Sequence, residues 1–284
     1  MTMKIGFIGT GVMGAAMAGH LLDAGNEVYV YNRTKAKTDD LVSRGATWRD
    51  TPHEVAEATD FVITIVGYPT DVKEVYDDIF QADVTGKILI DMTTSTPALA
   101  KEIGERAVVA GAQALDAPVS GGDVGAKNAT LTIMVGGPEG AYDKALPIFE
   151  ILGKTTARHG ENGAGQHCKM ANQIMIAGTM LGMSEFMVYA DAAGLNLEKV
   201  IETLSGGGAN NWSMANYAPR ILNKDFAPGF FVKHFVKDLK IALDEASAMN
   251  LDLPMTALAE KLYEKLADQD LGTQSLIKAY SDKF

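Results

Sequence analysis

Cysteine is nearly absent from this sequence, and its scarcity excludes several kinds of site. The single Cys168 has no partner for a disulfide within the chain, and one thiol cannot build a thiolate metal centre. The five histidines are scattered without the close spacing of metal ligands. We therefore expect no bound metal, and the lone thiol fits a reducing, cytoplasmic location.

Positive charge and long apolar runs are also scarce. The chain has 25 Lys and Arg against 36 Asp and Glu, a net charge of −11, whereas nucleic-acid binding requires a basic stripe. The uncharged stretch between Lys169 and Glu185 contains polar residues and falls short of the ~20 apolar residues that span a bilayer. The apolar start of the chain is too short for a signal peptide. We expect neither a nucleic-acid nor a membrane partner.

What the sequence does contain is an ordinary globular composition, and its 284 residues are about right for two domains. In the first half, short apolar runs alternate with amphipathic stretches. Strands are predicted at 4–9, 27–33, 61–66, 88–92, 112–119 and 131–135, and helices at 11–24, 35–44, 52–58, 69–80 and 97–110. Pro97 and Pro138 mark helix starts. Continuous apolar strands alternating with helices indicate a parallel sheet that is covered on both faces.

The pattern changes near residue 160, where strand signals stop. Helices are predicted at 164–192, 197–204, 212–222, 233–249 and 253–267. We therefore predict an α/β domain over 1–162 and an all-α domain over 163–284.

A glycine-rich motif lies between the first predicted strand and the first predicted helix. It reads Gly9-Thr10-Gly11-Val12-Met13-Gly14, and the second strand ends about 20 residues later, as in dinucleotide-binding folds. Gly9 would permit the tight turn, Gly11 the approach of the pyrophosphate, and Gly14 close packing of helix on strand. The helix N-terminus would add N–H donors and partial positive charge for the phosphates. The sequence therefore predicts a doubly wound Rossmann domain that binds NAD or NADP.

The end of the second strand indicates which dinucleotide is bound. NAD enzymes usually place Asp or Glu there for the ribose 2′-OH, whereas this chain has Asn32-Arg33-Thr34. Because a carboxylate is missing at this position, nothing there repels the 2′-phosphate of NADP(H). Arg33 with Thr34 can bind that phosphate. We favour NADP(H), with NAD(H) as the alternative.

Three further motifs carry a resemblance to a known family. They are DAPVSGGDVGAKN at 116–128, GAGQHCKMANQ at 163–173 and FVKHFVKDL at 231–239. Together with the glycine motif, they closely resemble the β-hydroxyacid dehydrogenase family in order and spacing. This family includes 3-hydroxyisobutyrate dehydrogenases, tartronate semialdehyde reductases and glyoxylate/succinic semialdehyde reductases.

The resemblance implies roles for individual residues. Lys169 would be the catalytic residue, and Ser120, Gly121 and Gly122 would bind the substrate carboxylate. It also implies that Thr94 lies against the nicotinamide ribose, that Lys237 closes over the cofactor, and that the chain forms a homodimer or homotetramer through its helical domain.

Two positions depart from the family pattern. The family often has Asn four residues after the lysine, whereas here Asn172 lies at +3 and Gln173 at +4. Either carboxamide could contact substrate, and the sequence does not decide between them. Val66-Gly67 replaces the usual Leu-Pro, which should loosen a cofactor contact made mainly by backbone.

The chemistry of these residues suits a hydroxy-acid dehydrogenase. The cofactor carries the hydride, so the protein must supply an acid/base and hold the substrate. A buried lysine near other cations has a lowered pKa and can exchange a proton near neutral pH. Lys169, Asn172 and Gln173 form one helical stripe, which sets carboxamide donors beside the acid/base, and residues 120–122 offer a hydroxyl and closely spaced amides for a carboxylate.

The sequence thus predicts an NADP(H)-dependent oxidoreductase that interconverts a small β-hydroxy acid and its semialdehyde or keto form. Substrate would lie between the two domains. An NAD-dependent 3-hydroxyisobutyrate dehydrogenase is the near alternative, and the helical part is short for a 6-phosphogluconate dehydrogenase. A non-catalytic NADP-binding sensor is the alternative from another class.

Overall fold

The computed structural model describes residues 2–284, which divide into two compact units. One unit ends at Lys169 and the other begins at Met170, within the long helix α8 (Ala164–Ala192). The structure therefore assigns the first turns of α8 to the first unit, whereas the sequence analysis places the boundary just before this helix begins.

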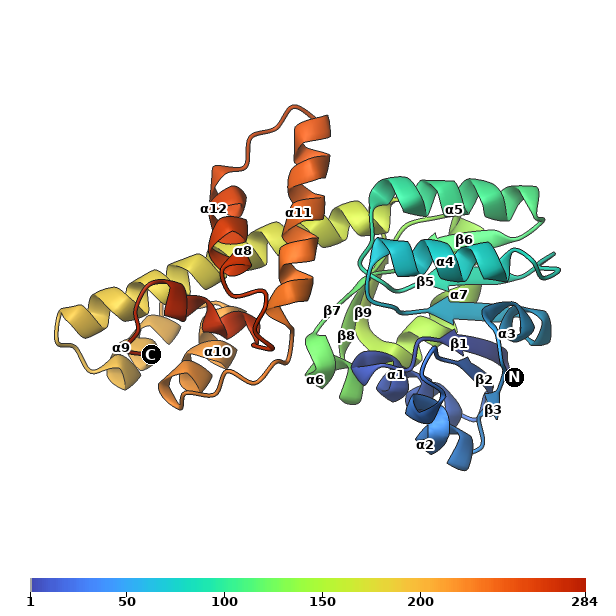
Figure 1. The fold of residues 1–284 in the computed structure, drawn as a ribbon, viewed down its shortest axis with the longest axis horizontal. Coiled ribbons are helices and arrows are strands. Elements are labelled where there is room, and N and C mark those ends of the chain that lie inside the picture. The colour runs from blue at the N-terminus through green and yellow to red at the C-terminus, as the bar shows by residue number, and fades with distance from the viewer. Residues whose placement is uncertain (1) are drawn as a thin grey trace. The chain divides into compact units, whose positions relative to one another are not determined.

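The first unit is built on a six-stranded sheet with the order β3-β2-β1-β4-β5-β6, in which all pairs are parallel (Figure 1). The strands are β1 (Lys4–Ile8), β2 (Glu27–Tyr31), β3 (Thr47–Trp48), β4 (Phe61–Thr64), β5 (Ile88–Asp91) and β6 (Gln113–Asp116). The strand order reverses between β1 and β4. In open sheets of this kind, ligands bind at the carboxyl ends of the strands at such a reversal.

Helices cover both faces of this sheet. On one face lie α1 (Val12–Asp23) and α7 (Glu139–Leu152), and on the other lie α3 (Pro52–Ala58), α4 (Pro69–Ile79) and α5 (Pro97–Val109) (Figure 1). Along β1, Ile5 and Phe7 pack with α1 and α7, whereas Ile8 packs with α3 and α4. The same alternation recurs in β4, β5 and β6, because successive side chains of a strand point to opposite faces. A short 3₁₀ turn η1 (Lys35–Thr38) and α2 (Asp39–Ser43) follow β2.

A second, three-stranded sheet lies beyond β6. It consists of β7 (Val119–Ser120), β8 (Leu131–Val135) and β9 (Gly153–Arg158), with β7 antiparallel and β9 parallel to β8. The prediction of one strand over 112–119 is therefore wrong, because β6 ends at Asp116 and the chain enters a different sheet at Val119. Pro118 lies in the interruption and has no N–H to continue a ladder.

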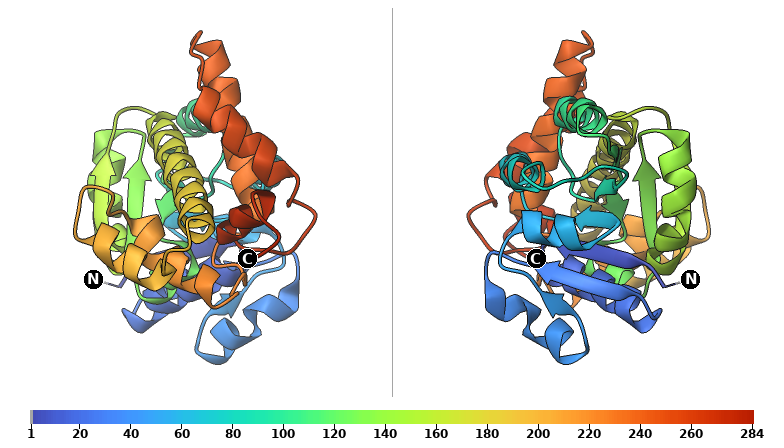
Figure 2. Two further views of the ribbon diagram at one scale, coloured as in Figure 1. Left: turned by 90° about the vertical axis from the view of Figure 1, so that its left-hand side faces the viewer. Right: turned by 90° about the vertical axis from the view of Figure 1, so that its right-hand side faces the viewer.

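The second unit is helical, as predicted. The remainder of α8 is followed by α9 (Leu197–Ser205), α10 (Trp212–Leu222), α11 (Val232–Ala248), α12 (Pro254–Glu264) and the 3₁₀ helix η2 (Thr273–Ala279). The helices α11 and α12 lie side by side (Figure 2). Met180, Met183 and Met187 of α8 pack with Phe235 and Tyr263 in one core. Among residues 2–284, no helix is both long and apolar enough to cross a membrane.

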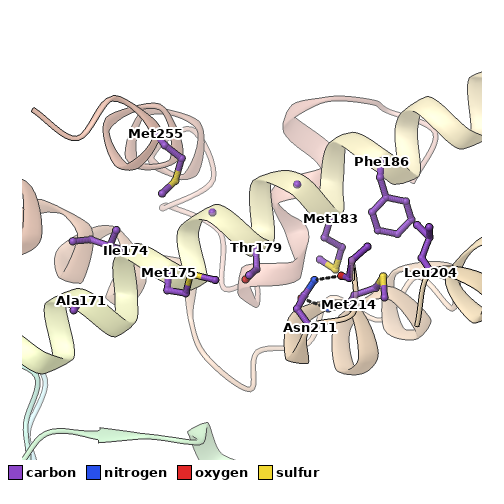
Figure 3. Close-up of a pocket in the computed structure, with 13 residues that line it drawn as sticks. Ala171, Ile174, Met175, Thr179, Met183, Phe186, Leu204, Asn211, Met214 and Met255 are labelled. Carbon is purple, nitrogen blue, oxygen red and sulfur yellow. Dashed lines mark hydrogen bonds between the residues drawn. The ribbon is translucent and has the colours of Figure 1, made fainter. Parts of the chain in front are cut away.

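An apolar groove of about 640 Å³ opens along α8 in this second unit (Figure 3). Met175, Thr179, Met183 and Phe186 line it from α8, and Met255 lines it from α12. The lining includes none of the predicted substrate or cofactor residues.

Candidate active site

The glycine loop between β1 and α1 is fixed by backbone contacts at two of its three glycines. Gly9 has φ +97°, and a Cβ there would lie 2.1 Å from the carbonyl oxygen of Ile65. A Cβ at Gly14 would lie 1.9 Å from the carbonyl oxygen of Gly9. Neither position tolerates a side chain. At Gly11, by contrast, an added Cβ would meet nothing within 4 Å, so there is room in front of this residue.

The space at Gly11 has the polar groups that a dinucleotide needs. Helix α1 begins at Val12, and no side chain caps its N-terminus among the described residues. Its first N–H groups and its partial positive charge therefore face this space. The buried Oγ1 of Thr10 has no hydrogen-bond partner within residues 2–284. A pyrophosphate supplies acceptors for both kinds of donor, so these residues fit an NAD(P) cofactor.

Asn32 joins this loop to the end of β2. Its Oδ1 accepts a hydrogen bond of 3.0 Å from the Thr10 amide, and its Nδ2 donates one of 2.9 Å to the Thr34 carbonyl. The carboxamide thus holds the glycine loop and residues 32–34 together. The position uses both the acceptor and the donor of an Asn side chain.

Arg33 follows directly, with its side chain 85% exposed. Its Nη1 lies 3.6 Å from Oδ1 of Asp71 in α4. Asp71 is itself fixed, because its Oδ2 accepts a hydrogen bond of 3.0 Å from the Tyr68 amide at the start of that helix. The guanidinium therefore lies at the carboxyl end of β2 with most of its donors facing outward, and a carboxylate that the sequence analysis missed lies beside it.

The loop that carries Thr94 is attached to the end of β5 by a buried carboxylate. Oδ1 of Asp91 accepts hydrogen bonds from Thr64 Oγ1 (2.9 Å) and from the Thr93 amide (3.1 Å). Burial raises the pKa of Asp91 to about 6, and the charge of Asp116, its register partner on β6, adds to this rise.

Asp116 holds the N-terminus of α8. Its two oxygens accept hydrogen bonds from the amides of Gly163 (2.8 Å) and Gln166 (2.9 Å), which are free donors at a helix start. Burial raises the pKa of Asp116 to about 6, although these amides act in the opposite direction. The first turn of α8 lies directly on the strand ends, since a Cβ at Gly165 would be 2.4 Å from the Asp116 carbonyl oxygen and 2.5 Å from that of Met134.

This anchored turn presents Lys169 to the start of the predicted carboxylate-binding segment. Lys169 is buried, and its Nζ donates a hydrogen bond of 2.9 Å to the carbonyl oxygen of Val119. Ser120 follows on β7, and then come Gly121 and Gly122, both with positive φ (+129° and +63°), where α6 (Gly122–Lys127) begins. The structure thus brings the ammonium group and residues 120–122 together within the first unit.

In the second unit, one chain of hydrogen bonds links the other predicted residues. Asn172 Nδ2 donates to Gln173 Oε1 (2.8 Å), and Gln173 Nε2 donates to Asp238 Oδ2 (2.6 Å). Asp238 Oδ1 lies 3.2 Å from Nζ of Lys237 on α11. Gln173 and Asp238 are both buried, so the carboxamide of Gln173, four residues after Lys169, forms its hydrogen bond to the Asp238 carboxylate away from solvent. Which of the two carboxamides contacts substrate stays a prediction.

The residues that sequence reasoning missed are carboxylates. Asp71 pairs with Arg33, Asp116 accepts a hydrogen bond from the Gln166 amide at the start of α8, and Asp238 accepts one from Gln173. For Asp116 and Asp238, the signal in the sequence is an acidic residue at a position that the local pattern expects to be buried. Within residues 2–284, no group of three or more His, Cys, Asp or Glu side chains could hold a metal ion.

The parallel sheet with a glycine loop at its point of reversal defines a dinucleotide-binding protein. Two family models cover nearly all of the chain. Residues 4–163 match the NAD binding domain of 6-phosphogluconate dehydrogenase, and residues 163–280 match the NAD-binding domain of NADP-dependent 3-hydroxyisobutyrate dehydrogenase.

Individual relatives agree with these models. An uncharacterized oxidoreductase of Bacillus subtilis is 49% identical over 286 residues, covering 99% of both chains. The 2-hydroxy-3-oxopropionate reductase of Escherichia coli is 38% identical over 268 residues, covering 93% of this chain and 91% of its own. Among solved structures, 3-hydroxyisobutyrate dehydrogenase of Mycobacterium tuberculosis, determined with L-serine, has a TM-score of 0.92 at 30% identity and 99% coverage of both chains.

The chain belongs to the β-hydroxyacid dehydrogenase family, as its motifs indicate. It is an NAD(P)-dependent oxidoreductase that acts on CH–OH groups, of the 3-hydroxyisobutyrate dehydrogenase and tartronate semialdehyde reductase type. This finding favours an enzyme over the non-catalytic sensor.

Proposed function

We propose that this protein is an NADP(H)-dependent reductase of small semialdehydes or glyoxylate, which interconverts such a compound and the corresponding hydroxy acid. The hydrogen bond from Lys169 Nζ to the Val119 carbonyl carries the proposal. It holds a buried cation one residue away from a segment suited to bind a carboxylate, as a carboxylate-bearing substrate with a neighbouring oxygen requires.

Lys169 serves as the acid/base in this proposal. When bound, the dinucleotide supplies or accepts the hydride at the substrate carbon. In reduction, Lys169 gives a proton to the carbonyl oxygen as carbon gains the hydride, and in oxidation it takes the hydroxyl proton as the hydride leaves. Ser120 Oγ and the amides of residues 121 and 122 hold the substrate carboxylate. Asn172 and Gln173 are the candidates for an additional donor to the reacting oxygen.

Arg33 and Thr34 provide the preference for NADP(H) in this proposal. A 2′-phosphate beside Arg33 would accept charge-assisted hydrogen bonds from the exposed guanidinium. Removing hydrogen bonds to a charged group costs about 1.5–3 kcal/mol, or roughly 10- to 100-fold in affinity. We therefore expect Arg33→Ala to weaken NADPH binding by this factor and to change NADH binding less than about twofold. Equal losses for both cofactors would contradict the preference.

The acid/base role is tested by Lys169→Ala. We expect turnover to be lost in both directions while the dissociation constant for NADPH, measured by fluorescence titration, stays within about threefold. Lys144→Ala removes an exposed lysine of α7 and should leave both quantities unchanged. Substantial residual turnover of the Lys169 variant would overturn the assignment.

A screen of C2–C5 semialdehydes and hydroxy acids with NADH and NADPH decides the substrate. The near alternative is NAD-dependent 3-hydroxyisobutyrate oxidation, which uses the same residues in the opposite direction. Fastest turnover of 3-hydroxyisobutyrate with NAD⁺ would favour this alternative over the reductase.

The functional form in our proposal is a homodimer or homotetramer. Exposed apolar residues of the helical unit support it, since Met175 at the groove is 67% exposed and Tyr189 on the same helix is 76% exposed. An apolar groove with large exposed apolar side chains is typical of protein–protein contacts.

A further inference from the structure

Gln166 makes a set of contacts in the first turn of α8 that the proposed mechanism does not use. The residue is fully buried. Its Oε1 accepts a hydrogen bond of 3.0 Å from the Ser95 amide, and its Nε2 donates one of 2.8 Å to the Thr93 carbonyl. The carboxamide therefore spans the loop 93–95 on both sides of Thr94, the residue predicted to lie at the nicotinamide ribose.

The backbone of the same residue is held from a different strand. The Gln166 amide donates to Asp116 Oδ2 at the end of β6, over a distance of 2.9 Å. Three residues further along the helix, Lys169 Nζ is held on the Val119 carbonyl at the start of β7. Residues at i and i+3 are neighbours on a helix surface, with Cβ atoms about 5–6 Å apart. The loop after β5, the carboxyl end of β6 and the start of β7 are therefore all held by the same turn of α8.

We propose that Gln166 is a positioning residue that fixes Lys169 relative to the loop 93–95, and so sets the distance between the proton-transfer group and the nicotinamide end of the cofactor. This inference rests on the proposed function. Gln166 contacts neither the reacting atoms nor, in this proposal, the substrate. Its effect arises because hydride and proton transfer require reacting groups to be held within a few tenths of an ångström.

The side-chain chemistry is specific to a carboxamide. One end must accept from the Ser95 amide and the other must donate to the Thr93 carbonyl. Methionine has a similar length and can do neither well. An ionised glutamate can accept but not donate, and it sets a negative charge against a carbonyl oxygen. A protonated glutamic acid can do both. Burial raises the pKa of a carboxyl group, so protonation of a glutamate at this position falls in an accessible pH range.

The experiment compares Gln166→Met and Gln166→Glu with wild type and with Gln81→Met, an exposed position after α4 that serves as the control. For Gln166→Met we expect kcat to fall roughly 10- to 100-fold, while the NADPH dissociation constant stays within about threefold. For Gln166→Glu, the ratio of variant to wild-type kcat should rise as pH falls from 8 to 5.5. The ratio for Gln166→Met should not change with pH. A kcat of Gln166→Met within twofold of wild type, or a flat ratio for Gln166→Glu, would overturn the proposal.

A second readout needs no turnover. In the protein without cofactor, hydrogen exchange of peptides covering 93–99 and 163–170 should accelerate together in Gln166→Met, because one side chain holds both segments. Acceleration of neither or of only one would also overturn the proposal. If wild type itself turns over no hydroxy acid or aldehyde, the proposed function fails, and exchange still decides whether Gln166 joins the two segments.

Discussion

The buried carboxylate of Asp91 should make the protein less stable as pH rises. Most acidic groups of folded proteins have the opposite effect on stability. Its pKa in the folded protein is about 6, against an ordinary value of 3.8, chiefly because of burial. The folded state therefore binds the proton more tightly than the unfolded state, and stability should fall as pH rises from about 4 to about 6 and then level off. The difference between the two pKa values corresponds to about 3 kcal/mol of destabilisation at pH 7.

Asp91→Asn should remove this cost without removing the local hydrogen bonds. Both donors, Thr64 Oγ1 and the Thr93 amide, bond to the same oxygen Oδ1, and an asparagine Oδ1 can accept both. The new amide group must also find an acceptor, so we expect a gain of about 1–3 kcal/mol at pH 7. The gain should shrink as pH falls through 6 and vanish near pH 4.

The measurement needs a signal from the first unit alone. The chain has two tryptophans, Trp48 on β3 of the first unit and Trp212 on α10 of the second. In a Trp212→Phe background, fluorescence during urea unfolding therefore reports on Trp48. Asp60→Asn alters an exposed carboxylate before β4 and should change stability by less than about 0.5 kcal/mol at any of these pH values. A stability difference for Asp91→Asn that is absent at pH 7, or constant between pH 4 and 7, would refute the reasoning.

Three further predictions concern other parts of the chain. Asp71→Asn should tighten NADPH binding up to about fivefold and leave NADH binding unchanged, because it removes the charge of a carboxylate that pairs with the exposed Arg33 at 3.6 Å; titrations with both cofactors check this. Gln173→Asn should withdraw the donor from Asp238 and destabilise the helical unit by about 1.5–3 kcal/mol, seen as earlier urea unfolding by Trp212 fluorescence in a Trp48→Phe background; an unchanged midpoint would count against it. Met175→Glu should shift the oligomer toward smaller species in light scattering, whereas a monomeric wild type would contradict the proposed assembly.

The elements that sequence predicts well are those with a strong local cause. The helix at 164–192 has the predicted bounds, and the glycine loop lies between β1 and α1 as the motif requires. The strands β3 and β9 escaped prediction. β3 has only two residues, and β9 reads GKTTAR with no buried residue, so neither shows an apolar run. Their positions follow from pairing with β2 and β8, which is a tertiary effect.

The candidate site likewise contains residues with a local signal in the sequence and residues that only long-range contacts bring into place. The family resemblance pointed to Lys169 and the segment 120–122, and local features agree with it, because the lysine precedes a long uncharged stretch and the segment contains adjacent glycines. The hydrogen bonds that hold the surrounding helix α8 in place join residues far apart in sequence: Asp116 is 50 residues from Gln166, and Gln173 is 65 from Asp238. No local pattern pairs such residues in a single sequence, so only the fold reveals them.

The two buried carboxylates at the carboxyl ends of β5 and β6 each fix a segment of the candidate site. Asp91 and Asp116 are register partners on adjacent strands, and burial raises the pKa of both to about 6. At neutral pH such groups cost stability, yet each accepts hydrogen bonds from the segment that follows or crosses its strand. Asp91 holds the loop that carries Thr94, and Asp116 holds the helical turn that carries Lys169. The cost of burying two charges is therefore concentrated where the loop predicted to face the cofactor and the proposed proton-transfer group must both be fixed.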